Sequence, residues 1–504
     1  MKKMNRGNEF MLTVFSKSLL IVFLLVTSLN TFAGKGTEIK ITVKDLANSP
    51  LILANYYGDK QYIKDTFEID KNGVCLIKLD TVLPPGIYLA VFPKINNKYF
   101  EFVVSEPKIS LTTDSIDLAG HMKVENSPEN KVFYDDMFYL SEKRKEVDKY
   151  NALLKEAKDE KTKAELKTTL TKIDEEVKAK RLSIEKDHPT TLYSKLLRSM
   201  REPELSKDGP RNSKGVLTDS AWQWREYKAK YWDNVDLNDD RLIRTPIFHN
   251  KLSYYYTKVV IQNPDTLIKD GDELLAKMNP KNDLFRYSLV YMLNEMAKSK
   301  IMGFDAVYVH IVNKYYAKGY TPWVDSTQLY KIVERGRILE PLLIGKKARN
   351  IILSDSTLKQ MRSLYDFKNR FVILAFWDPD CGHCKKEIPK LAELYHKMKA
   401  EKIDVEVFAP GIFDIAEMKK WTDFINENKL DWINVADPYH QNNFRFEWDI
   451  QSTPQLFILD KDKVIKAKRI GVENIEDFIK HEIDPKYIPK NTAPLEEKKE
   501  EEAH

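Results

Sequence analysis

The stretch FVILAFWDPDCGHCKKEIPK, Phe371 to Lys390, joins an apolar run to two closely spaced cysteines. The run RFVILAF (Arg370–Phe376) is apolar after its first residue, which is typical of a strand buried on both faces. Cys381 and Cys384 follow it closely, and they are two of only three cysteines in 504 residues. A helix is predicted from about Cys381 towards Ala400. Two thiols at this C-x-x-C spacing can bind a metal ion, form a structural disulfide or exchange electrons with another disulfide.

Electron exchange is the use of the pair that best fits the rest of the sequence. A structural zinc site needs four ligands, commonly a second C-x-x-C pair or two spaced histidines. The chain has no second cysteine pair, and its nine histidines include no H-x₃₋₅-H spacing. A structural disulfide would close a very small loop and would gain little from restricting the unfolded chain. We therefore expect a redox-active pair that needs no metal ion and no bound cofactor.

The position of the pair suggests a separate role for each thiol. A thiolate is the attacking species, and the unpaired N–H groups at a helix N-terminus favour a thiolate at Cys381. Cys384, one turn later, would then attack the mixed disulfide and release the substrate. His383 lies between them and favours the thiolate when it is cationic. Glu387, one turn further on, is predicted to relay protons; an exposed Glu that only pairs with a helix neighbour is the alternative.

Residues 340–485 are predicted to alternate strands and helices in the order strand, helix, strand, helix, hairpin, helix. Within them, FWDPDCGHCKKEIP and STPQLFILD resemble the thioredoxin superfamily, and in particular its TlpA/ResA-like group of exported thiol–disulfide oxidoreductases. The resemblance implies an α/β thioredoxin fold that begins near Pro341. It also implies a cis Pro454 that faces the cysteines and leaves the Thr453 backbone open to pair with an extended substrate. The acid typical of the group's active-site helix matches Glu387.

Further residues are expected to support the site, and two positions depart from the family pattern. The supporting residues are Trp377, His383, Thr453 and Pro454. Plain thioredoxins carry a buried Asp where this chain has Ala375, so proton relay would fall to Glu387. Asp380 stands where the family often has a small residue. Together with Asp378, its charge would tend to raise the pKa of the Cys381 thiol.

The N-terminus has the layout of a secretory signal peptide. Basic residues precede the apolar run LLIVFLLV (Leu19–Val26), and the small residues Thr31 and Ala33 suit cleavage after Ala33. The run is too short to span a bilayer comfortably, although an uncleaved anchor is the alternative. No cysteine directly follows the run, so no lipoprotein anchor is expected. We therefore expect a periplasmic or otherwise exported protein that is soluble after export.

The rest of the chain predicts a multidomain protein. After the signal peptide at 1–33, short β-branched and aromatic segments over 34–130 predict a β-sandwich-like domain. Apolar residues at spacings of three and four over 131–339 predict an all-α middle domain that opens with a helical hairpin. The C-terminal thioredoxin fold is expected at 340–485. The charged stretch 486–504 is predicted to be a disordered tail.

Charge and cysteine content narrow the range of partners. The 81 basic residues nearly balance the 76 acidic ones, so the overall charge gives no indication of nucleic-acid binding. Cys75 alternates with apolar residues, so it is predicted to be a small buried side chain. A thiol that pairs with another protein is the alternative for Cys75.

The expected function is thiol–disulfide exchange with a protein or peptide disulfide. The TlpA/ResA resemblance implies a reductase that is supplied by a membrane electron donor. Gly382 and His383 between the cysteines resemble the dipeptide of protein disulfide isomerases, so an isomerase or oxidase is one alternative. The other is a non-catalytic binding protein that uses its front domains and keeps the thioredoxin fold as a scaffold.

Overall fold

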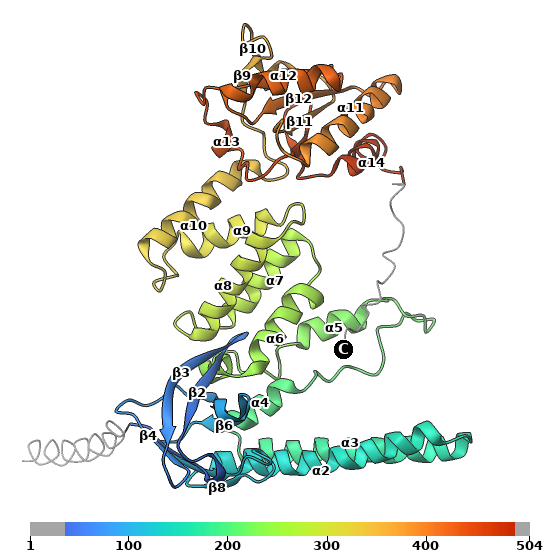
Figure 1. Cartoon of the computed structure of the whole chain (residues 1–504). Helices are drawn as coiled ribbons and strands as arrows, with labels where there is room; N and C mark the ends of the chain where they lie inside the picture. The colour runs from blue at the N-terminus through green and yellow to red at the C-terminus, as the bar shows by residue number, and fades with distance from the viewer. Residues whose placement is uncertain (1–35, 489–504) are drawn as a thin grey trace, which may run out of the picture. The chain divides into compact units, whose positions relative to one another are not determined.

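The computed structural model describes residues 36–488 of the chain (Figure 1). The predicted signal peptide and residues 489–504 of the predicted tail lie outside the described residues. Among the helices of residues 36–488, none combines the length and the apolar character needed to cross a bilayer.

The described residues form two compact units. The first holds the residues up to Val259 together with Lys277–Tyr287, and the second holds Val260–Ala276 and the residues from Ser288 onward. Helix α8 (Asp283–Lys298) is therefore shared between them. The domain boundaries inferred from the sequence remain predictions.

The first unit begins with two four-stranded sheets, as the predicted β-rich N-terminal domain requires. Their strand orders are β4-β1-β7-β8 and β3-β2-β5-β6. All pairs are antiparallel except β1 with β7, which is parallel. The strands are β1 (Glu38–Val43), β2 (Ser49–Tyr57), β3 (Lys60–Ile69), β4 (Val74–Lys78), β5 (Gly86–Phe92), β6 (Lys98–Val104), β7 (Lys108–Thr113) and β8 (Lys123–Glu125). In β1, alternate residues are buried, which gives the strand one core face.

Cys75 and a predicted turn illustrate how the local sequence forms this domain. The turn before β4 closes with a hydrogen bond from Gly73 N–H to Asp70 O of 3.0 Å. Gly73 has a φ of +78°, which glycine adopts without steric cost. In β4, Cys75 is 1% exposed, and burial raises the pKa of its thiol to about 11. Its position agrees with a small buried side chain.

Two long helices follow and lie side by side as an antiparallel hairpin (Figure 1). They are α2 (Pro128–Glu156) and α3 (Glu160–Asp187). The Asp159 side chain caps α3 by accepting a hydrogen bond of 2.8 Å from Thr162 N–H. An ion pair of 2.8 Å joins Lys143 of α2 to Glu176 of α3. The predicted helical hairpin is thus present.

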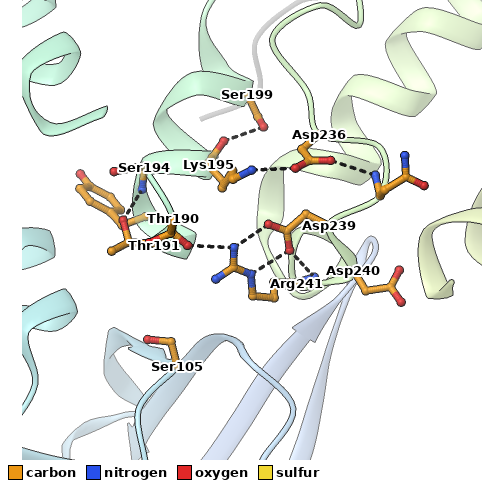
Figure 2. A network of polar contacts seen from close by, with 12 residues as sticks. Ser105, Thr190, Thr191, Ser194, Lys195, Ser199, Asp236, Asp239, Asp240 and Arg241 are labelled. Atoms are coloured by element: carbon orange, nitrogen blue, oxygen red, sulfur yellow. Dashed lines mark hydrogen bonds and ion pairs between the residues drawn. The ribbon is translucent and has the colours of Figure 1, made fainter. Parts of the chain in front are cut away.

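The next helices of the first unit are α4 (Leu192–Met200), α5 (Trp222–Lys230) and α6 (Pro246–Tyr254). Figure 2 shows Arg241 donating to the Asp239 carboxylate at 2.6 and 2.8 Å and to Thr190 O at 3.1 Å. Lys195 of α4 pairs with Asp236 at 2.7 Å. These contacts tie the segment around α4 to the short turn at Asp240–Arg244.

The second unit combines helices of the middle region with the α/β part of the chain. The helices are α7 (Pro264–Ala276), the later part of α8, α9 (Asp305–Ile311) and α10 (Ser326–Leu339). Asp325 caps α10 by accepting from the N–H groups of Thr327 and Gln328. The chain then enters the α/β part after a short turn at Glu340–Leu342.

The α/β part contains a seven-stranded mixed sheet with the order β10-β9-β13-β12-β11-β14-β15. The interior strand β11 is parallel to β12 and antiparallel to β14. The strands are β9 (Ile352–Asp355), β10 (Met361–Ser363), β11 (Phe371–Phe376), β12 (Val405–Gly411), β13 (Ile433–Ala436), β14 (Gln455–Asp460) and β15 (Ile465–Lys468). The helices are α11 (Cys384–Ala400), α12 (Met418–Glu427), α13 (Phe444–Glu447) and α14 (Val472–Ile483). This arrangement confirms the predicted thioredoxin-like α/β fold, which opens with the antiparallel pair β9–β10.

The continuous apolar run of β11 is explained by two cores, one on each face of the sheet. All six residues of β11 are buried. Alternate residues from Phe371 to Ala375 join the core that also holds buried residues of α11 and α14. The residues between them join the core with Phe444 and Trp448. The strand is thus packed on both faces, and this packing fixes the position at which the chain reaches the cysteines.

Candidate active site

The cysteine pair lies where the chain passes from β11 into α11. The regular part of α11 begins at Cys384, one turn later than the sequence predicted. The helical hydrogen bonds nevertheless start earlier, because Lys385 N–H donates to Cys381 O at 3.0 Å. Cys381 is partly exposed, Cys384 is fully buried, and both are free thiols. One sulfur can therefore meet a substrate, and the other lies behind it.

Hydrogen bonds around Cys381 favour its thiolate. Burial raises the pKa of the thiol, but hydrogen bonds with the Thr453 side chain and with the backbones of Cys384 and His383 outweigh burial, so the pKa lies below its usual value. The Cys384 N–H group donates to Cys381 Sγ at 3.5 Å. This is the donor arrangement expected at the start of a helix.

Cys384 has the opposite environment. Burial raises the pKa of its thiol to about 12, and the neighbouring Cys381 contributes in the same direction. A contact of 3.5 Å from Asp378 N–H to Cys384 Sγ opposes this only in part. At neutral pH, Cys384 is therefore held as a thiol beside a partner that ionises more readily.

The loop before β14 faces the exposed thiol. The Thr453–Pro454 peptide bond is cis, as the family resemblance implied. Cys381 Sγ lies 3.2 Å from Thr453 O, to which the thiol can donate. Thr453 and Pro454 thus lie next to Cys381, although they are far from it in the sequence.

The negative charge of Asp380 opposes the thiolate of Cys381 less than the sequence suggested. The Asp380 carboxylate pairs with Lys420 of α12 at 2.5 Å and with Lys385 at 3.7 Å. The hydrogen bond from Lys420 is the main reason that the pKa of Asp380 lies below its usual value. Because this negative charge has two cationic partners, it does not prevent the lowered pKa of Cys381.

Glu387 lies in the first turn of α11. Its side chain is 28% exposed, and its carboxylate accepts from Lys390 Nζ at 2.8 Å. The proton-relay role remains a prediction, and the pair with Lys390 is the contact that the alternative interpretation expects.

We expect Glu387→Gln to slow turnover by roughly tenfold or more if Glu387 relays protons to the cysteine pair. The pH dependence of Cys384 reactivity should change at the same time, while thermal stability changes little. Lys390→Gln is the matched control, because it removes the same ion pair and keeps the carboxylate. Equal effects of the two substitutions on turnover would assign Glu387 to surface pairing.

The other predicted site residues occupy different layers. Trp377 is fully buried, with its ring 5.1 Å from that of Phe424, and its supporting role remains a prediction. His383 is exposed between the two cysteines. Ala375 is buried in the core. Among residues 36–488, no group of three or more His, Cys, Asp or Glu side chains is arranged to hold a metal ion.

Three residues near the site were missed by the sequence reasoning. They are Lys420, Arg335 and Asp449. Lys420 pairs with Asp380, and Arg335 pairs with Asp449 shortly before the Thr453–Pro454 loop. No local motif marks them, since each becomes relevant only through a contact between distant segments.

Two family models match separate parts of the chain. Residues 344–468 match the AhpC/TSA family, and this range contains the cysteine pair and Pro454. Residues 37–133 match a domain of unknown function (DUF4369). The second match covers the N-terminal sheets and assigns them no activity.

Several relatives align with the C-terminal part. The chain is 29% identical over 144 residues to the thiol-disulfide oxidoreductase ResA of Bacillus thuringiensis, covering 28% of this chain and 79% of the relative. It is 28% identical over 152 residues to ResA of Bacillus subtilis, covering 30% and 76%. A solved domain of a "possible thiol-disulfide isomerase" from Cytophaga hutchinsonii is 42% identical, covering 29% of this chain and 96% of that one, with a TM-score of 0.27. Residues 344–468 thus form an AhpC/TSA-family domain, and this part of the chain is similar to the thiol–disulfide oxidoreductase ResA proteins.

Proposed function

We propose that this protein is an exported reductase of protein or peptide disulfides, with Cys381 as the nucleophile and Cys384 as the resolving thiol. The observation that carries the proposal is the contrast within the pair. Cys381 is accessible and its pKa is lowered, whereas Cys384 is buried and its pKa is raised to about 12. A pair with this asymmetry has one thiol ready to attack and a second that reacts only when a disulfide forms beside it.

The reaction consists of two thiol–disulfide exchanges. The Cys381 thiolate attacks one sulfur of the client disulfide, forms a mixed disulfide and releases one client thiolate. Cys384 then loses its proton and attacks Cys381 Sγ, which releases the second client thiol and leaves a Cys381–Cys384 disulfide. The client gains two electrons, and a donor dithiol must return two electrons to the pair. We assign that task to a membrane electron donor.

The loop at Thr453 and Pro454 is the proposed binding site for the client backbone. Its closeness to Cys381 Sγ supports an extended peptide lying across the loop with its disulfide at the exposed thiol. The names of the ResA relatives support a thiol–disulfide oxidoreductase, and the direction of electron flow is our inference from the resemblance.

We expect the pair to have a reduction potential between roughly −270 and −180 mV, the values of thioredoxin and protein disulfide isomerase. The lowered pKa of Cys381 stabilises the reduced pair and so works to raise the potential. The measurement is equilibration of the purified protein with glutathione buffers. A potential above roughly −180 mV, with a mostly oxidised pair in cells, would indicate an oxidase or isomerase.

Export is proposed from the N-terminal sequence alone. A basic stretch, an apolar run and small residues at the cleavage site together predict removal of residues 1–33. We expect N-terminal sequencing of protein recovered from the cell envelope to begin at Gly34. Recovery of the intact N-terminus would contradict cleavage.

A further inference from the structure

A buried carboxylate lies just before the Thr453–Pro454 loop. Asp449 is 4% exposed and binds three neighbouring side chains. Arg335 contacts both of its oxygens, with Nη1–Oδ1 at 3.2 Å and Nη2–Oδ2 at 3.3 Å. Arg469 donates to Oδ2 at 3.2 Å, and Gln451 donates to Oδ1 at 2.9 Å. A two-pronged contact of this kind fixes the orientation of a carboxylate as well as its position.

The contacts of the Asp449 side chain fix the point at which the loop starts. The backbone of Asp449 has a φ of +48°, so the chain turns there through the left-handed region. The far end of the loop is fixed where Arg469 N–H donates to Leu456 O at 2.7 Å. Residues 450–454 therefore span two anchored points, and Thr453 O lies 3.2 Å from Cys381 Sγ within that span.

Arg335 comes from outside the matched thioredoxin-like range. It belongs to α10, whereas the family match begins at residue 344. A second contact joins the same two regions, since Lys468 of β15 pairs with Asp305 of α9 at 2.5 Å. Lys468 is 3% exposed, so this contact is also largely removed from solvent. Helices α10 and α9 of the middle region thus make charged contacts with Asp449, just before the loop, and with Lys468 of β15.

We propose that Arg335 is a positioning residue of the thiol site, which holds Asp449 so that the Thr453–Pro454 loop stays against Cys381. The inference rests on the proposed function and extends it to the helical region, because α10 becomes part of the redox unit. Arg335 acts through Asp449 and has no proposed contact with the client. A shift of the loop by even one ångström would weaken client alignment and the Thr453 side-chain hydrogen bond that helps to lower the pKa of Cys381.

The test compares Arg335→Gln with Arg337→Gln in the full chain. Arg337 lies on the same helix, is 73% exposed and pairs with Glu334, so it controls for loss of a cation from α10. We expect Arg335→Gln to raise the KM for insulin, used as a protein disulfide, by roughly tenfold. The midpoint of Cys381 alkylation with iodoacetamide should move up by about half a pH unit. Arg337→Gln should leave both values unchanged.

Arg335→Lys keeps the charge but cannot reproduce the two-pronged contact. It should show a smaller change in the same direction, and it serves as the test if the Gln variant does not fold. Arg469 still pairs with Asp449 in both variants, so the buried carboxylate keeps a cationic partner. A change in melting temperature alone, with KM and the alkylation midpoint as in Arg337→Gln, would overturn the proposal. The alkylation midpoint needs no turnover, so failure of the reductase function can be told apart from failure of the positioning role.

Discussion

Cys381→Ser is expected to abolish disulfide reduction, lowering turnover by at least roughly a thousandfold, because it removes the attacking sulfur. The assay is reduction of insulin with dithiothreitol as the electron donor, measured against the background rate without protein. Cys384→Ser should also slow turnover strongly, because its first step remains available but only dithiothreitol can then resolve the mixed disulfide.

Cys75→Ser is the matched control for these substitutions. Cys75 is buried in β4, and burial raises its pKa to about 11, so we expect it to take no part in exchange. We expect this variant to keep full activity. Substantial turnover by Cys381→Ser would show that another group is the nucleophile, and loss of activity in Cys75→Ser would implicate the N-terminal domain.

The second large effect is the selectivity of alkylation within the pair. With a pKa of about 12, only on the order of one Cys384 in ten thousand is a thiolate at pH 8. Cys381 has a pKa below that of an ordinary thiol, so a much larger fraction of it is ionised at this pH. We therefore expect iodoacetamide to modify Cys381 faster than Cys384 by a factor of about a thousand or more.

The pH dependence of the two alkylation rates shows whether the pKa of each thiol is lowered or raised. The Cys381 rate should level off once the pH exceeds its lowered pKa. The Cys384 rate should keep rising by about tenfold per pH unit across the same range, because its thiolate fraction is still growing. Peptide mass spectrometry after brief labelling measures both, and denatured protein is the control in which the two thiols react alike. Similar rates in the folded protein would contradict the proposed division of roles.

The local sequence was sufficient to predict the frame of the site. An apolar run without alternation indicated a strand buried on both faces, and β11 indeed contributes alternate residues to two cores. The C-x-x-C spacing and its position after that strand located the pair at the start of α11. The motif around Pro454 indicated a cis bond, and the structure has one. These features depend on residues close together in the chain or on a family pattern.

The electrostatic surroundings of the site could not be predicted in the same way. The effect of Asp380 on Cys381 was expected from their closeness in sequence, but the charge of Asp380 is balanced by Lys420, a residue of α12. Nor does any pattern in α10 mark Arg335 as the partner of Asp449. Such pairs arise only when distant elements pack, and they change the pKa of a thiol or the position of a loop without leaving a local signal.

The most direct test of the account is capture of the mixed disulfide by the Cys384→Ser variant. After incubation with insulin, non-reducing electrophoresis and peptide mass spectrometry would identify the bond. We predict a stable adduct linked through Cys381, sensitive to dithiothreitol, and little adduct with Cys381→Ser. The opposite result would contradict the assignment of Cys381 as the nucleophile: an adduct through Cys384 in the Cys381→Ser variant, and no adduct through Cys381 in the Cys384→Ser variant.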